Sequence, residues 1–344
     1  MDMEDLKKLP ELLLPWYREN RRELPWRRTK EPYHVWLSEI MLQQTRVEAV
    51  KGYYARFLEA LPTIESLANC DDEMLHKLWE GLGYYSRVRN LKKAARVIME
   101  SHGGLFPSDH AAVRALPGIG DYTAGAICSI AFGLPTPAVD GNVLRVLSRL
   151  RADAEPIDLP AVKKRVQGEL AGIYPADCPG EFTQALMELG ATLCGPNWEP
   201  RCGECPCREF CKGRENWKNY PVKLPKKEKK QENRTVFLLH SGDKWAVEKR
   251  PDKGLLAGLW QFPNEGGHLT AEEAVKWAED KGLHPRNVER SVDRHHIFTN
   301  IRWDLRGWFL EVDETAGGFT WMTLEEIDEQ AALPTAFRQF REEI

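Results

Sequence analysis

The sequence predicts two domains of different class: a mainly α-helical N-terminal domain and an α+β C-terminal domain. Three observations support this division. The chain has 344 residues, which is long for a single hydrophobic core. Residues 6–215 repeat apolar positions at spacings of three and four, whereas the chain beyond 234 alternates over short runs. A charged stretch poor in apolar residues separates them. We therefore predict domains over 1–221 and 234–344, joined by an exposed linker over 222–233.

Helical periodicity in the first domain covers four stretches, 35–58, 75–82, 88–101 and 141–150. Proline lacks the backbone donor that a helix interior requires. We expect helices to end at three proline dipeptides, Leu61-Pro62, Phe106-Pro107 and Leu134-Pro135.

In the second domain the spacing of apolar residues changes from a helical period to the alternation of strands. Four runs rich in Val, Phe, Trp and Thr are typical of strands, 234–239, 245–249, 301–310 and 318–322. A helical pattern over 271–281 interrupts them, so we predict an α+β fold without internal repeats.

Composition limits the function classes. No run of about 18 apolar residues occurs, and the first 14 residues lack a signal-peptide core, so we expect a cytoplasmic protein with no membrane contact, nucleoid-associated if bacterial. The net charge of −4 does not itself indicate nucleic-acid binding. Basic residues gather over 18–30 and 87–96. Such clusters are usually solvated faces, and DNA contact is the alternative interpretation.

A glycine-containing turn over 116–125 lies between two helical stretches. Gly118 and Gly120 allow positive φ and expose consecutive backbone N–H groups. Because these groups precede a helix, they can hold a phosphate without reading base sequence. An ordinary tight turn is the alternative. The flanking apolar residues and the following helix favour a helix-hairpin-helix DNA-binding element.

Twenty residues beyond Gly120, a proline-rich break places Asp140 at the start of an apolar helix. Aspartate is a preferred N-cap residue, so a purely structural role is one interpretation. A catalytic carboxylate is the other, and the two roles are compatible.

This order of hairpin and aspartate resembles the endonuclease III superfamily of base-excision DNA glycosylases. Bifunctional members carry within the hairpin a lysine that forms a Schiff base, and this chain has Tyr122 there. A phenol cannot form an imine with the sugar. The resemblance therefore implies a monofunctional enzyme that hydrolyses the glycosidic bond.

Three longer segments, 24–27, 35–47 and 79–87, resemble the MutY family, which removes adenine mispaired with 8-oxoguanine or guanine. The resemblance implies that Glu39 is the general acid that protonates adenine, and that Asp140 stabilises the developing cation. It also implies that Tyr122 and Asn142 orient these two carboxyl groups. For Glu39 alone, an exposed position on an amphipathic helix is the alternative.

The chemistry explains why two carboxyl groups are needed. Adenine leaves poorly until it is protonated, and the sugar left behind becomes an oxocarbenium cation. One carboxyl must therefore hold a proton near neutral pH, which requires burial to raise its pKa. The other must stay ionised to stabilise or trap the cation.

Because the target base lies inside a duplex, it must be flipped out. The resemblance assigns Gln44 and Tyr84 to filling or wedging the gap, and Trp26, Arg27 and Gln184 to the adenine pocket. Each of these side chains could equally belong to the core or the surface.

Five of the eight cysteines lie within 194–211. Thiolates at such spacings bind either a [4Fe–4S] cluster or a tetrahedral zinc ion. The family resemblance implies a [4Fe–4S] cluster, and we expect Cys207 not to be a ligand. The first gap has seven residues where the family has six. The expected ligands are Cys194, Cys202, Cys205 and Cys211.

Residues 249–263 resemble the Nudix-like domain that is appended to the MutY catalytic domain. A Nudix hydrolase needs several acidic helix residues to hold Mg²⁺, and Val275-Lys276 replaces its Arg-Glu pair, so nucleotide hydrolysis is not expected. The resemblance assigns recognition of 8-oxoguanine to Phe298, Thr299 and Asn300. Asn300 replaces a frequent histidine and cannot become charged. Ordinary strand residues with Phe298 in the core are the alternative.

Three other functions remain to be separated: a mismatch thymine or uracil glycosylase, an endonuclease III-like lyase, and a non-enzymatic iron–sulfur DNA-binding module. The first would not require Glu39 or the second domain, and the second would require a lysine in place of Tyr122. The third would not require Glu39 and Asp140 together. We expect a monomer whose partner is double-stranded DNA containing 8-oxoguanine:adenine or guanine:adenine mispairs.

Overall fold

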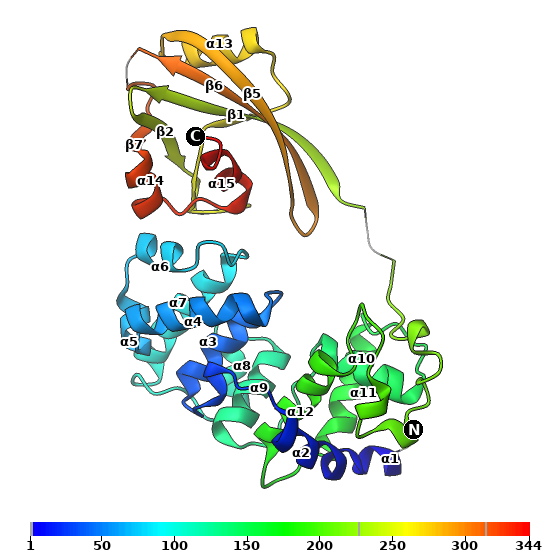
Figure 1. The fold of residues 1–344 in the computed structure, drawn as a ribbon. Coiled ribbons are helices and arrows are strands. Elements are labelled where there is room, and N and C mark those ends of the chain that lie inside the picture. The colour runs from blue at the N-terminus through cyan, green and yellow to red at the C-terminus, as the bar shows by residue number, and fades with distance from the viewer. Residues whose placement is uncertain (1–2, 226–227, 314) are drawn as a thin grey trace. The chain divides into compact units, whose positions relative to one another are not determined.

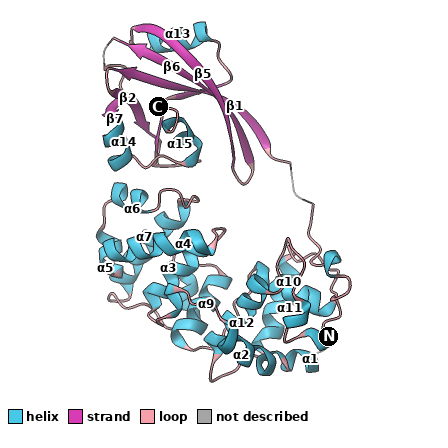
Figure 2. Cartoon of the chain, in the orientation of Figure 1, coloured by secondary structure: helices cyan, strands magenta, loops and turns pink. Residues whose placement is uncertain are grey.

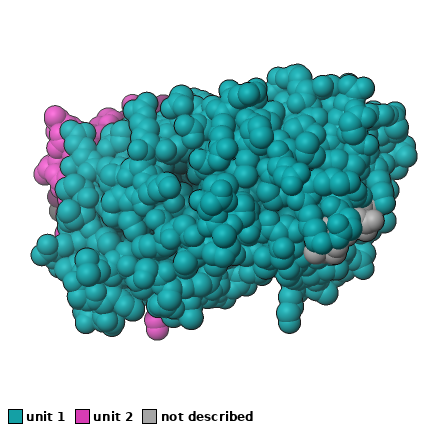
Figure 3. All heavy atoms as spheres, turned by 90° about the horizontal axis from the view of Figure 1, so that it is seen from below, with its two compact units in different colours: residues 1–69, 89–225 teal, residues 70–88, 226–344 magenta. Residues whose placement is uncertain are grey.

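The protein, a computed structural model, is described over residues 3–225, 228–313 and 315–344 (Figure 1). Its fold divides into two compact units: one is formed by the chain up to 69 and by 89–225, the other by 70–88 and 226–344 (Figure 3). The C-terminal unit thus includes a helical segment from the first third of the sequence. No helix among the described residues is long and apolar enough to span a membrane.

The N-terminal unit is helical, as predicted (Figure 2). Its helices are α1 (Met3–Lys7), α2 (Leu9–Asn20), α3 (Pro32–Leu42), α4 (Val47–Ala60), α5 (Ile64–Asn69), α7 (Ser86–Ser101), α8 (His110–Ala115), α9 (Asp121–Phe132), α10 (Gly141–Arg151), α11 (Pro160–Ala171) and α12 (Pro179–Thr192), and α7 crosses the unit boundary. Helix α12 contacts α2, α9 and α10, and α3 contacts α9. These contacts gather α3, α9, α10 and α12 around the site described below.

One helix prediction needs correction. We expected continuous periodicity over 35–58, but α3 ends at Leu42 and α4 begins at Val47. Gln44 lies in this break with a φ of 57°, a left-handed conformation that interrupts a right-handed helix. The same break leaves the Gln44 side chain exposed.

The C-terminal unit is a mixed sheet with strand order β3-β2-β1-β6-β5, to which β4 pairs through β1 and β7 through β2. Its strands are β1 (Lys230–Ser241), β2 (Lys244–Lys249), β3 (Trp260–Gln261), β4 (Asn264–Gly266), β5 (Pro285–Ile297), β6 (Ile301–Val312) and β7 (Thr320–Thr323). Strands β1 and β6 pair in parallel, and the other pairs are antiparallel. Strand β1 begins within the segment predicted as linker, and residues 226–227 of that segment lie outside the described residues.

Helices cover both faces of this sheet. Val236 and Leu238 share a core with α14 (Leu324–Gln330) and α15 (Thr335–Arg341), whereas Phe237 and Leu239 share another with α13 (Ala271–Asp280). This alternation follows from the two-residue period of a strand. The segment 70–88 contributes α6 (Asp72–Leu78) to this unit.

Candidate active site

Asp140 caps the N-terminus of α10, as predicted. One carboxylate oxygen accepts from the Val143 N–H at 2.8 Å, and the other accepts from the Asn142 side-chain amide at 2.7 Å. Burial raises the pKa of Asp140, and these two hydrogen bonds oppose that rise because they favour the ionised form. Asp140 therefore has a structural role that leaves its carboxylate at the pocket wall.

Glu39 lies on α3 and is only 6% exposed, so the alternative of a solvated position is wrong. The Tyr122 hydroxyl donates a hydrogen bond to Glu39 Oε2 at 2.6 Å. Burial raises the pKa of Glu39 to about 7, while the Tyr122 hydrogen bond lowers it and the Asp140 charge raises it. Burial also raises the pKa of Tyr122 well above its ordinary value, so the phenol keeps its proton and donates.

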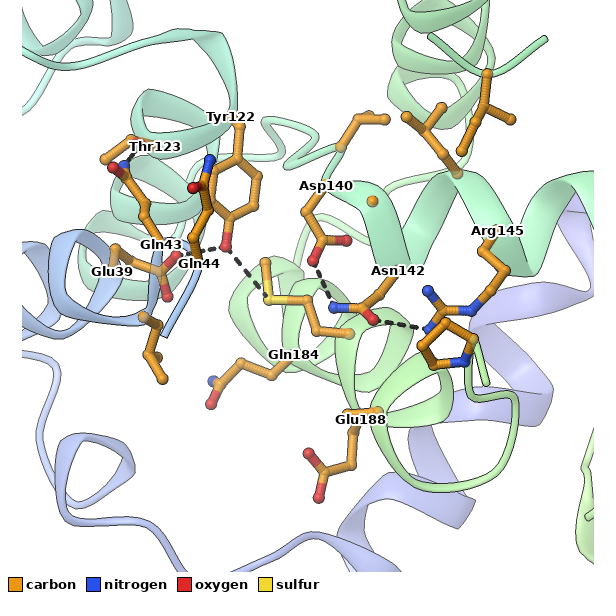
Figure 4. A pocket seen from close by; sticks show the side chains of 18 of the residues that line it. Glu39, Gln43, Gln44, Tyr122, Thr123, Asp140, Asn142, Arg145, Gln184 and Glu188 are labelled. Atoms are coloured by element: carbon orange, nitrogen blue, oxygen red, sulfur yellow. Dashed lines mark hydrogen bonds between the residues drawn. The ribbon is translucent and has the colours of Figure 1, made fainter. Parts of the chain in front are cut away.

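These groups share one pocket of about 1160 Å³. Figure 4 shows Tyr122 directed at Glu39, with Asp140 and Asn142 on the neighbouring wall. Five of the predicted substrate residues line the same pocket, Trp26, Arg27, Gln44, Gly120 and Gln184. Trp26 is largely buried against Tyr54, with ring centroids 5.5 Å apart.

Gly125 explains how the two carboxyl-bearing segments come together. A Cβ at this position of α9 would overlap the Pro137 carbonyl oxygen. Without a side chain, α9 can lie directly against the segment that leads to Asp140. Since Tyr122 is on the first turn of α9, this contact brings the phenol and Asp140 to one pocket.

The hairpin has the predicted place between α8 and α9, but its two glycines differ. Gly118 has a φ of 79°, and a Cβ there would lie 2.6 Å from Asn90 Cβ. Gly120 has a φ of −95° and caps α9, so our expectation of positive φ holds only for Gly118. A Cβ at Gly120 would meet no atom of the protein within 4 Å, so this position is open toward an external ligand.

The structure also reveals a buried ion-pair network that the sequence analysis missed. Glu188 of α12 lines the pocket, and its side chain has 0% exposure. It accepts hydrogen bonds from Arg22 and Arg27, both at 2.8 Å. The bonds to these arginines outweigh burial and hold the pKa of Glu188 at about 2. Its only signal in the sequence is a charged residue one helical turn after Gln184.

A second set of missed contacts links the pocket to the cysteine loop. Arg145, 7% exposed, donates from Nη2 to Asn142 Oδ1 at 2.8 Å and from Nε to the Cys194 carbonyl at 2.8 Å. Asn142 in turn donates to Asp140. A continuous chain of hydrogen bonds therefore joins the carboxylate to the start of the cysteine loop.

The cysteine-rich loop encloses a small cavity. The four predicted ligands, Cys194, Cys202, Cys205 and Cys211, line it together. Cys207 is instead fully buried in the core that packs α10 against α12. Arg149 Nη1 lies 3.3 Å from Cys194 Sγ and donates to the Gly195 carbonyl at 2.8 Å. In the described part of the chain, no three His, Cys, Asp or Glu side chains gather closely enough to hold a single metal ion.

The remaining predicted residues belong to the C-terminal unit. Tyr84 has a φ of 48° and a 49% exposed side chain. Phe298, Thr299 and Asn300 form the turn between β5 and β6 rather than part of a strand. Phe298 packs on Trp303 with ring centroids 4.8 Å apart, whereas Thr299 and Asn300 are exposed. The predicted recognition segment is thus an anchored turn with two available polar side chains.

Comparison with known proteins assigns both units to families. Residues 37–168 match the HhH-GPD superfamily of base excision DNA repair proteins, and residues 235–343 match the NUDIX domain. A solved thermostable thymine-DNA glycosylase shares 28% identity and a TM-score of 0.57 over 62% of this chain and 100% of its own. Together, the fold and these matches define a base-excision DNA glycosylase.

Relatives of known function show to which family of DNA glycosylases the chain belongs. Human adenine DNA glycosylase is 34% identical over 95% of this chain and 72% of its own length. The adenine DNA glycosylase of Buchnera aphidicola (strain APS) is 34% identical over 85% of this chain and 83% of its own. That of Arabidopsis thaliana is 39% identical over 92% of this chain and 60% of its own. The chain belongs to the adenine DNA glycosylase family.

Proposed function

We propose that this protein is a monofunctional DNA glycosylase that flips out and removes adenine mispaired with 8-oxoguanine or guanine. One observation carries the proposal: the pocket holds a buried carboxyl, Glu39, with a pKa near 7 beside a second carboxylate, Asp140. A general acid works best when its pKa lies near the working pH. The hydrogen bonds on Asp140 favour its ionised form, which suits it to a developing cation.

The reaction begins with a proton. Protonated Glu39 donates it to the imidazole-side nitrogen of adenine, and the Tyr122 hydroxyl keeps the carboxyl oriented toward the pocket. The glycosidic bond then breaks, its electron pair leaves with the neutral adenine, and C1′ becomes an oxocarbenium cation. The Asp140 carboxylate stabilises or traps this cation until water adds to C1′ and leaves an abasic site. Tyr122 offers no amine, so the strand stays intact.

DNA binding rests on the hairpin and on two exposed side chains. The N–H groups after Gly118 precede α9, and the open space at Gly120 admits a phosphate close to the backbone. Gln44 and Tyr84 occupy left-handed conformations, which persist only where the surroundings favour them. We assign them to filling or wedging the gap that a flipped base leaves. Trp26, Arg27 and Gln184 then receive the adenine.

We assign recognition of 8-oxoguanine to the turn of Phe298, Thr299 and Asn300. Its two exposed side chains can donate and accept hydrogen bonds. We expect Thr299→Ala combined with Asn300→Ala to reduce the preference for 8-oxoguanine over guanine by about tenfold, equivalent to one or two lost hydrogen bonds. Paired single-turnover rates opposite the two bases measure this preference. An unchanged preference would remove this turn from the recognition site.

The residues of the cysteine loop fit a [4Fe–4S] cluster held by Cys194, Cys202, Cys205 and Cys211. These four cysteines line a single cavity, and thiolates are the ligands that iron–sulfur clusters take in proteins. When bound, the cluster would supply a rigid link that holds the loop carrying Arg201 and Arg208 toward DNA. We expect the isolated protein to be brown and to contain iron and sulfide; a colourless zinc protein would refute this assignment.

The decisive experiment is single-turnover incubation with three duplexes, containing adenine opposite 8-oxoguanine, adenine opposite guanine, and thymine opposite guanine. We expect strand cleavage at adenine only after alkali treatment, fastest opposite 8-oxoguanine. Loss of thymine instead of adenine would support a mismatch glycosylase, and cleavage without alkali would support a lyase. Either result would overturn the proposal.

A further inference from the structure

Glu188 binds two guanidinium groups at the wall of the pocket, those of Arg22 and Arg27. Its carboxylate accepts from Arg22 Nε at 2.8 Å, Arg22 Nη2 at 2.9 Å, the Arg22 backbone N–H at 3.0 Å and Arg27 Nη2 at 2.8 Å. Four donors on one carboxylate of 0% exposure form a rigid arrangement, because water cannot replace any of them.

Arg27 makes two side-chain hydrogen bonds within this network. Its Nη2 is bonded to Glu188 and its Nη1 donates to the Arg22 carbonyl at 3.0 Å. Its guanidinium also lies over the Tyr17 ring, 5.5 Å from the ring centroid. With a side chain only 12% exposed, Arg27 has little access to water, so it depends on these partners.

Glu39 lies within the electrostatic reach of this arginine. Three charged or titratable groups act on Glu39: Tyr122 through its hydrogen bond, Asp140 through its negative charge, and Arg27 through its positive charge, which lowers the pKa of Glu39. Around Glu188 the corresponding groups are Arg22, Arg27 and Tyr17. A guanidinium released from Glu188 would find in Glu39 a carboxyl of the same pocket. Pairing with Glu39 would hold that carboxyl ionised, without a proton to give.

We propose that Glu188 is a positioning residue that retains the Arg27 guanidinium and thereby leaves Glu39 free to carry the catalytic proton. This role rests on the proposed function, in which Glu39 is the general acid. Glu188 does not touch the reacting atoms in this scheme. It acts through Arg27, and it separates the arginine that binds the base from the carboxyl that protonates it.

The test is the pH dependence of single-turnover adenine excision in Glu188→Gln, a variant of the same shape without the charge. We expect the alkaline limb of the profile to move toward acid by about one pH unit. At pH 8 the rate should therefore fall about fivefold further below the original protein than it does at pH 6. A folded Glu188→Gln protein with an unmoved alkaline limb would overturn the proposal.

Two further variants test the link through Arg27 and provide a control. Arg27→Gln removes the guanidinium whose charge lowers the pKa of Glu39, so we expect its alkaline limb to move in the opposite direction. Glu188 still has Arg22 as a partner in this variant, which therefore remains informative if Glu188→Gln does not fold. An acidward shift or no shift in Arg27→Gln would count against the proposal. Glu181→Gln, on the same helix and paired with Arg18 at 2.8 Å on the surface, is the matched control and should leave the limb unchanged.

A readout that does not depend on activity separates this inference from the proposed function. The carboxylic C=O stretch of Glu39, identified by its loss in Glu39→Gln, can be titrated by infrared difference spectroscopy. We expect its midpoint to fall in Glu188→Gln and to rise in Arg27→Gln. If Glu39→Gln excises adenine normally, the proposed function fails. If Glu39→Gln is inactive but the midpoint is the same in all variants, only the role of Glu188 fails.

Discussion

Glu39 and Glu188 line the same pocket and are both buried, yet their acid–base properties are opposite. Glu39 receives one hydrogen bond from a phenol, and its pKa is raised to about 7. Glu188 receives four hydrogen bonds from two arginines, and its pKa falls to about 2. Burial acts in the same direction on both carboxyls. The hydrogen-bonding partners, and not burial, therefore decide which glutamate can hold a proton near neutral pH and which stays ionised and holds the arginines.

The largest effect should come from removing the acid. We expect Glu39→Gln to lower single-turnover adenine excision by about 10³-fold, since general acid catalysis contributes between 10² and 10⁴. Binding of the mispaired duplex should be unchanged, because Gln has nearly the same shape. Near-normal excision in Glu39→Gln would show that Glu39 is not the general acid, and its functional contrast with Glu188 would then be wrong.

Asp140→Asn tests the carboxylate proposed to face the developing cation. Asparagine is also a good N-cap, so α10 should still form. The amide carries no charge, and we expect excision to fall by about 10²- to 10³-fold because the oxocarbenium cation loses its counter-charge. Helical content measured by circular dichroism is the control. Full activity in Asp140→Asn would show that Asp140 acts only as the N-cap of α10.

Stability should respond to the two glutamates in opposite directions. The pKa of Glu39 is raised from 4.5 to about 7, so folding favours its protonated form; that contribution is present below pH 4.5 and is lost as pH rises through 7. We therefore expect Glu39→Gln to stabilise the protein by about 3 kcal/mol at pH 8 and hardly at all at pH 4.5. Urea unfolding at both pH values measures this difference.

Glu188→Gln should instead destabilise the protein at neutral pH by about 3–5 kcal/mol, because it leaves the largely buried Arg27 and the partly exposed Arg22 without the charge of a fully buried carboxylate. The lowered pKa of Glu188 means that its contribution is present above pH 4.5 and is lost as pH falls toward 2. If both variants moved stability in the same direction, the contrast between the two glutamates would not hold.

The sequence allowed Glu39 and Asp140 to be predicted because each lies in a local string that the family resemblance identifies. Glu188 could not be predicted in the same way. Its role depends on Arg22 and Arg27, which lie more than 160 residues away. The basic cluster over 18–30 suggested a solvated or DNA-facing surface, yet those two arginines turn inward to Glu188.

The secondary structure was also predicted only where the local sequence carries a signal. Helices with strong apolar periodicity, such as α10, were predicted to within one residue. Strand β5 was missed because its sequence is mostly charged and polar: it pairs with β6 along most of its length, and only a few side chains, such as Val288 and Val292, pack against a core. The break between α3 and α4 was missed because a left-handed Gln44 has no compositional signal.

The smallest effect on the excision rate is expected from Tyr122→Phe, which removes the hydrogen bond that distinguishes Glu39 from Glu188. The Tyr122 hydrogen bond lowers the pKa of Glu39, so Tyr122→Phe should raise that pKa further and move the alkaline limb of the excision profile upward by about one pH unit. The rate at pH 7 should fall by less than about tenfold, because the acid keeps its proton but loses its orientation. Tyr33→Phe is the matched control, since Tyr33 lies on α3, the helix of Glu39, and donates to the Leu61 carbonyl at 2.8 Å. A downward shift in Tyr122→Phe would mean that the phenol supports the protonated form of Glu39. In that case the hydrogen bond on Glu39 would act in the opposite direction to those on Glu188, and the two sites would differ in the kind of hydrogen bond and not only in the number.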